Sequence, residues 1–121
     1  MSNYKPRIYI AGPMRGVPKF NRPAFEEWAE TLRAIGWDVV SPVEIGAKFG
    51  TDLQIDADPE LLRKVKGEEL RALVTCEAIY LLRDWQYSVG AREELAAALS
   101  RHLAVYLAPH APMPRTWKER K

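Results

Sequence analysis

The apolar residues of this chain fall into short continuous runs, separated by stretches in which they recur at helical spacing. Four of the runs are short and β-prone, and each predicts a strand. The third and fourth are apolar at every position, which is typical of strands buried on both faces of a sheet. The four runs span residues 7–11, 37–41, 78–82 and 103–107.

The stretches between the runs predict three helices. The first begins at Pro23, continues to Ile35 and stops at Gly36, because proline suits a first helical turn and glycine a C-terminal stop. The second opens at Asp58 and ends near Thr75, and the third covers 91–101. Residues 43–57 carry two glycines and no clean period, so they predict a loop.

The order β-α-β-α-β-α-β predicts a three-layer, doubly wound parallel sheet of the flavodoxin-like or Rossmann-like α/β class, because parallel neighbours need crossover connections. We expect one domain over 1–108, followed by a proline-spaced, basic tail over 109–121. Ligands of such sheets bind outside the carboxyl ends of the strands. The function should therefore lie in the loops that come after the strands.

Composition narrows the kind of ligand. The 121 residues are 47% hydrophobic and 28% charged, as in an ordinary soluble globular domain. A formal net charge of +2 gives no field that argues for a nucleic-acid polymer, so a small anion fits better. The N-terminal apolar run is too brief for a secretory or membrane segment, and we expect a cytoplasmic protein without a membrane partner.

Metal and thiol chemistry have little support in the sequence. Cys76 is the single cysteine, which rules out an intrachain disulfide, and its place before an apolar run predicts a buried, unreactive thiol. His102 and His110 have no Asp or Cys at ligand spacing, so we predict no metal site.

The loop after the first run reads Gly12-Pro13-Met14-Arg15-Gly16. Its glycines allow a ligand to approach the backbone, and the Arg15 guanidinium is suited to a phosphate or carboxylate. It is not a Walker loop, because the Gly-Lys-Ser/Thr ending is absent. The alternative is a tight strand-to-helix connection with a solvent-facing arginine.

The loop after the third run contains Asp84 and Trp85 and leads to Ser88, where a helix N-cap is expected. Together with Gly90 and Ala91, Ser88 would present free backbone N–H groups to an anion at the positive end of the helix dipole. Trp85 is a candidate for stacking on a planar ring. A plain capped helix explains the same residues equally well.

Glu93 and Glu94 are predicted in the first turn of that helix, where the dipole would lower the pKa of a carboxyl and keep it ionised. Since they are neighbours in sequence, only one can face the strand ends. A first-turn glutamate that merely complements the dipole is the alternative. Tyr9, on the first run, could orient a carboxylate or simply pack in the core.

Two stretches, IYIAGPMRG at 8–16 and SVGAREELAAA at 88–98, resemble the nucleoside 2-deoxyribosyltransferase superfamily. The resemblance covers about residues 7–107. It is closest to short phage and bacterial relatives without assigned activity, and the chain is also similar to the 2′-deoxynucleoside 5′-phosphate N-hydrolases. In these families the position of Glu94 is the nucleophile and that of Tyr9 orients it.

Other site residues follow from the same resemblance. Glu69 is the nearest match to an acidic residue that assists proton transfer to the base, with Asp84 or solvent as alternatives. Arg15 and Ser88 match residues that hold a 5′-phosphate, which favours nucleotides over nucleosides. The predicted substrate-binding residues are Gly12, Pro13, Met14, Arg15, Gly16, Asp84, Trp85, Ser88, Gly90 and Ala91.

The resemblance implies cleavage or transfer at the N-glycosidic bond of a (2′-deoxy)nucleoside 5′-monophosphate, without a metal or organic cofactor, by a homodimer or homotetramer. Two alternatives belong to other classes. One is a non-catalytic sensor that binds a nucleotide or nucleotide-sugar in the same pocket. The other is an interaction protein that works through the basic tail at 109–121.

Overall fold

A computed structural model describes residues 4–114. Its centre is a parallel sheet in the order β2-β1-β3-β4, and the predicted α/β class is confirmed. The elements are β1 (Arg7–Ala11), η1 (Pro18–Asn21), α1 (Arg22–Ala34), β2 (Asp38–Val40), α2 (Pro42–Ala47), α3 (Asp52–Ala57), α4 (Pro59–Leu73), β3 (Ala78–Leu81), η2 (Trp85–Tyr87), α5 (Val89–Ser100) and β4 (Ala104–Leu107).

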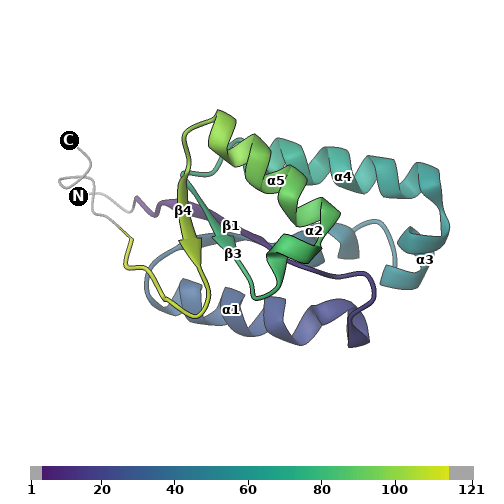
Figure 1. The fold of residues 1–121 in the computed structure, drawn as a ribbon, viewed down its shortest axis with the longest axis horizontal. Helices are drawn as coiled ribbons and strands as arrows, with labels where there is room; N and C mark the ends of the chain where they lie inside the picture. The colour runs from purple at the N-terminus through teal and green to yellow at the C-terminus, as the bar shows by residue number, and fades with distance from the viewer. Residues whose placement is uncertain (1–3, 115–121) are drawn as a thin grey trace.

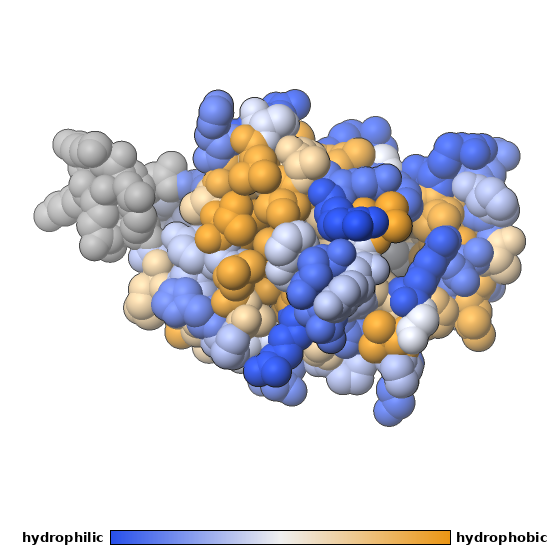
Figure 2. Space-filling view, viewed as in Figure 1, coloured by the Kyte–Doolittle hydropathy of each residue, from blue (hydrophilic) through white to orange (hydrophobic). Residues whose placement is uncertain are grey.

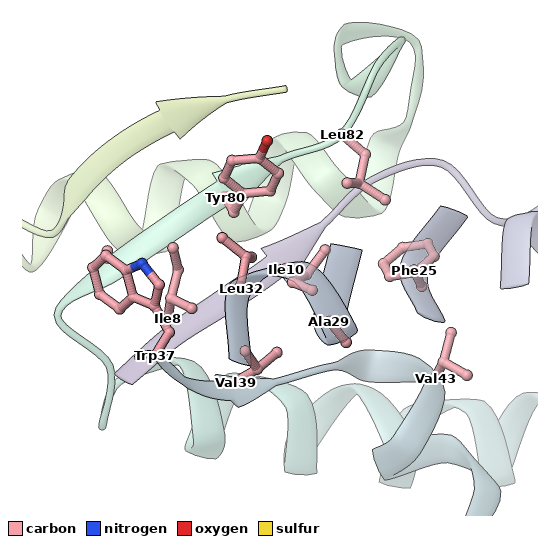
Figure 3. Close-up of a cluster of buried hydrophobic side chains, with 11 residues drawn as sticks. Ile8, Ile10, Phe25, Ala29, Leu32, Trp37, Val39, Val43, Tyr80 and Leu82 are labelled. Carbon is pink, nitrogen blue, oxygen red and sulfur yellow. The ribbon is translucent and has the colours of Figure 1, made fainter. Parts of the chain in front are cut away.

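The sheet separates two hydrophobic cores, because successive side chains of a strand point to opposite faces. On one face, α1 packs Phe25, Ala29 and Leu32 against the strands, as Figure 3 shows. On the other face lie α4 and α5 (Figure 1), and Leu73 and Ala98 belong to that core. The molecule is therefore the three-layer sandwich that the alternating pattern predicts.

Helix caps fix where the main helices begin. The Asp58 carboxylate accepts hydrogen bonds from the backbone N–H groups of Glu60 and Leu61 at the start of α4. The Ser88 hydroxyl accepts one from Ala91 at the start of α5, so the predicted N-cap is confirmed. Gly36 follows α1 with a φ of 114°, a conformation that favours glycine.

The prediction of a loop over 43–57 is wrong. This segment contains most of α2 and all of α3. Each helix has six residues, too short for a helical period to be visible, and each depends on its N-cap. The Ser41 hydroxyl caps α2, and Thr51 forms a capping box with Gln54 at α3.

The prediction that the fourth run is buried on both faces is also wrong. β4 is an edge strand that pairs only with β3 among residues 4–114, and most of its residues are exposed. Leu107 has 51% of its surface exposed and Val105 has 37%. In Figure 2 an apolar patch lies over β4 and α5. The run forms a strand, as predicted, but no element of the described chain covers the exposed side chains of this strand.

Residues 109–114, the beginning of the predicted tail, pack on the α1 side of the sheet. The Tyr80 hydroxyl donates a hydrogen bond to the His110 carbonyl at 2.6 Å, and Trp37 Nε1 donates one to the Pro112 carbonyl at 2.7 Å. The rest of that tail, 115–121, lies outside the described residues. Within 4–114, no helix has the length and apolar character needed to cross a membrane.

Candidate active site

Two cavities lie where the carboxyl ends of β1 and β3 meet the loops. The larger, of about 590 Å³, lies beside α1 and is lined by residues of the loops that come after β1, β3 and β4. The smaller, of about 80 Å³, lies between the first loop and helices α2, α3 and α4. Arg15 lines both cavities. This end of the sheet is where a doubly wound fold binds its ligands.

The Tyr9 hydroxyl of β1 donates a hydrogen bond to Glu94 Oε2 of α5 at 2.5 Å. Tyr9 is fully buried and Glu94 is partly buried. The neighbouring Glu93 points away, with its side chain 62% exposed and one carboxylate oxygen 3.8 Å from Lys66 Nζ. The prediction that only one of the two glutamates faces inward is confirmed.

The protonation predicted for Glu94 is wrong. The first turn of α5 holds no acidic residue, so Glu94 lies beyond the strongest part of the helix dipole. Burial, together with the nearby Glu69 charge, raises its pKa to about 8, against the lowering effect of the Tyr9 hydrogen bond. Removal of water from the carboxyl outweighs the dipole.

Glu69 is the second carboxyl of this site. It belongs to α4 and lines the smaller cavity, and burial raises its pKa to about 7 against the opposing charge of Lys66. Since the Glu69 charge raises the pKa of Glu94, the two carboxyls are coupled and titrate as a pair. Near neutral pH the pair holds about one proton, an arrangement suited to acid and nucleophile roles.

The first loop presents Arg15 to an acidic partner that the sequence alone does not predict. Its Nε lies 2.6 Å from Asp56 Oδ1 of α3.

The other residues of the first loop differ in how much space surrounds them. Gly12 lies close to another part of the protein, because an added Cβ would lie 2.7 Å from the Cβ of Leu82. Gly16 has a φ of 79° and open space around it, while Met14 lines the smaller cavity and Pro13 the larger.

The loop after β3 meets the first loop across the larger cavity. Arg83, Asp84 and Tyr87 line it opposite Arg15, whereas Ser88 is not among its lining residues and has its hydroxyl engaged with the helix. Trp85 packs against the core on the α4 and α5 side. The two loops thus come together, but through Asp84 and its neighbours more than through Ser88.

The N-terminus of α5 contains the small residues predicted to bind an anion. Ala91 is buried, with 1% of its surface exposed, and it donates the capping hydrogen bond to Ser88. At Gly90 the nearest atom to an added Cβ is the Ser88 hydroxyl, 4.0 Å away, so a side chain there would have room.

Sequence reasoning missed three residues around these cavities. Trp28, within the first predicted helix, lines the larger cavity. Tyr87 is 79% exposed at the same cavity. Asp56 lies in a segment predicted as a loop, so the direction of its side chain could not be predicted. The capping pattern of Thr51 and Gln54 was the sequence signal for the helix that contains Asp56.

Two remaining predictions concern Cys76 and metals. Cys76 is buried, as predicted, and burial raises the pKa of its thiol to about 11, which disfavours the reactive thiolate. Across residues 4–114, no three His, Cys, Asp or Glu side chains gather closely enough to hold a metal ion.

Comparison with known proteins gives a family without an assigned activity. A search of curated proteins finds no match, and the resemblance to nucleoside 2-deoxyribosyltransferases stays a prediction. One family model matches residues 6–107, and its description is "Domain of unknown function (DUF4406)". Since that match covers most of the 121 residues, the chain belongs to the DUF4406 family.

Proposed function

We propose that the protein cleaves, or transfers at, the N-glycosidic bond of a (2′-deoxy)nucleoside 5′-monophosphate. The observation that carries the proposal is the Tyr9 hydroxyl bound to Glu94 at 2.5 Å, with Glu69 near enough to raise the pKa of that carboxyl. A double-displacement glycosidase uses one carboxylate as its nucleophile and a second carboxyl as its acid and base, and here a tyrosine orients the first.

In the first step the ionised Glu94 carboxylate attacks C1′ of the sugar. The bond from C1′ to the base nitrogen breaks, and its electron pair stays with the base, which takes a proton from Glu69. Water then attacks C1′, returns a proton to Glu69 and frees Glu94. A second base in place of water gives transfer instead of hydrolysis.

Tyr9 supports the reactive protonation state. Its hydrogen bond lowers the pKa of Glu94, against the effect of burial, and so favours the ionised form of Glu94 that attacks C1′. Arg15 is the proposed phosphate ligand. Its pair with Asp56 is partly solvent-exposed, with side chains 60% and 42% exposed, and such pairs are weak enough to exchange for a phosphate.

The test is release of free base from a panel of nucleoside and deoxynucleoside 5′-monophosphates, measured by chromatography. Wild-type protein is expected to release base from at least one compound, and Glu94→Gln to lower the rate by roughly 1,000-fold or more, because it removes the nucleophile. Glu93→Gln is the matched control, since Glu93 is the exposed neighbour, and it should retain activity.

The outcome also separates the two rival functions. A thermal shift with nucleotides in the absence of any base release would favour a sensor. A sensor does not need an ionised Glu94, so this function is compatible with the pKa that burial raises. An interaction protein predicts that deletion of 115–121 abolishes function. That deletion spares 109–114, whose carbonyls bond Tyr80 and Trp37.

Self-association stays a prediction. Exposed apolar side chains on α5 and β4, among them Leu99 and Leu107, are the ones that a dimer contact would cover. Figure 2 shows an apolar patch over these two elements. Light scattering of the wild-type protein and of Leu107→Glu would test it, with a shift toward monomer expected in the variant.

A further inference from the structure

The larger cavity beside α1 has no role in the chemistry proposed above. Its volume of about 590 Å³ lies within the range of small-molecule sites. Part of its wall is apolar, with Leu82 and Pro109 among the lining residues, and Trp28 adds an aromatic ring. That ring packs on Tyr80, with the centroids 5.0 Å apart, so Trp28 is held in place as a rigid wall.

The rim of this cavity combines a cation with an exposed aromatic ring. Arg83 is exposed and forms no ion pair with any residue between 4 and 114. Tyr87, four residues later, is 79% exposed. A free guanidinium suits a phosphate, and the rings of Tyr87 and Trp28 suit a planar group. Asp84, also on the rim, can accept hydrogen bonds from hydroxyl groups.

Arg15 lies between this cavity and the smaller one, which Glu69 lines, because Arg15 is a lining residue of both. The smaller cavity, of about 80 Å³, is the narrower of the two. A phosphate on Arg15 would thus stand between a narrow reaction cavity and a wide, partly aromatic one.

We infer that the larger cavity binds a second group attached to the 5′-phosphate, so that the preferred substrate is a pyrophosphate-linked dinucleotide and the monophosphate is its minimal form. This rests on the proposed function. The first phosphate lies on Arg15 and the second on Arg83. The second ring lies against Trp28 and Tyr87, and Asp84 accepts a hydrogen bond from the second sugar.

The experiment compares two matched compounds, deoxyadenosine 5′-monophosphate and two deoxyadenosines joined 5′ to 5′ by a pyrophosphate, or the same pair with the base that the panel favours. We expect a KM for the dinucleotide about tenfold below that of the monophosphate. Arg83→Ala and Tyr87→Ala each should raise the KM for the dinucleotide about tenfold and leave that for the monophosphate within about twofold.

Arg101→Ala is the matched control. Arg101 follows the C-terminus of α5, at the opposite end of the sheet from the cavity, and its loss should change neither KM. Equal KM values for the two compounds, or an equal effect of Arg83→Ala on both, would overturn the inference and leave the proposed function standing.

Equilibrium binding of the same two compounds to Glu94→Gln separates the two failures. If neither compound is cleaved but Arg83→Ala weakens dinucleotide binding about tenfold in this background, the proposed hydrolysis fails and the second-group site is supported. If the dinucleotide binds no more tightly than the monophosphate, the second-group site is refuted whatever the activity.

Discussion

Two buried tyrosines, on adjacent strands and opposite faces of the sheet, show how one residue type serves two purposes. Tyr9 on β1 and Tyr80 on β3 are both fully buried, and their positions in the register are one step apart. The Tyr9 hydroxyl donates to a carboxylate, Glu94, at 2.5 Å, while the Tyr80 hydroxyl donates to a backbone carbonyl, that of His110, at 2.6 Å.

The acceptor makes the difference between the two faces. Burial raises the pKa of both phenols, but the Glu94 charge adds to the effect at Tyr9, whereas burial alone raises the pKa of Tyr80 to about 12. A carboxylate can gain or lose a proton near neutral pH and a carbonyl cannot. The Tyr9 hydroxyl is therefore bonded to a group that can take part in proton transfer, and the Tyr80 hydroxyl to one that cannot.

The largest effect that would sharpen this comparison is expected from Glu69→Gln. It removes the proposed proton donor and should lower the maximal rate of base release about 100-fold. It also removes the like charge that raises the pKa of Glu94, so the activity should appear at lower pH than in the wild type. Glu68→Gln, at an exposed position, is the control for the pH profile.

Tyr9→Phe should have the next largest effect. Loss of the hydroxyl removes a hydrogen bond that favours ionised Glu94, so we expect kcat/KM to fall about tenfold and the pH at half-maximal activity to rise. A pH–rate profile measures both. Unchanged activity with an unchanged profile would place Tyr9 among the merely structural residues and end the contrast with Tyr80.

The pH dependence of stability tests the Tyr9 face without a substrate. The folded-state pKa values of Glu69 and Glu94, about 7 and about 8 because of burial, lie above the ordinary glutamate pKa of 4.5. The folded state then holds protons that the unfolded state has lost, so the free energy of unfolding should fall as pH rises from about 4.5 to about 8.

Urea unfolding at a series of pH values measures that slope. Above about pH 8 the contribution of the pair is fully lost and the curve should flatten. Glu94→Gln should reduce the slope and make the protein more stable than the wild type at about pH 8, because no buried charge remains at that position. A slope that survives in Glu94→Gln and Glu69→Gln alike would contradict the assignment.

The smallest effect is expected on the other face. Tyr80→Phe removes a hydrogen bond to a carbonyl and should lower the free energy of unfolding by about 1 kcal/mol, with base release within about twofold of wild type. Denaturant unfolding and the base-release assay check the two parts. A large loss of activity in Tyr80→Phe would break the division between the faces.

Much of the fold can be predicted from local sequence, and the two exceptions have different causes. The apolar runs predict all four strands, and Asp58 and Ser88 predict the caps of α4 and α5, because these signals are local. Helix α3 is not predicted because it is too short to show a helical period, and its capping box covers just the four residues from Thr51 to Gln54. The exposure of β4 depends on which elements pack beside it in space, and an apolar run does not encode its neighbours.

The candidate site shows the same limit. Adjacency in sequence predicts that Glu93 and Glu94 point apart, but spacing alone does not say which one meets Tyr9, 85 residues away along the chain. The raised pKa of Glu94 comes from burial, a property of the assembled core. The pairing of Arg15 with Asp56 likewise joins two segments that have no local relation.

The short segment at 109–114 has a consequence for where this domain ends. The family match stops at residue 107, at the last residue of β4, whereas the Trp37 and Tyr80 side chains find their acceptors at residues 112 and 110. A chain cut at the family boundary leaves two buried donors unsatisfied, at roughly 1–3 kcal/mol each. The unit that folds is thus longer than the segment that the family model matches, and it extends at least to the carbonyl of Pro112.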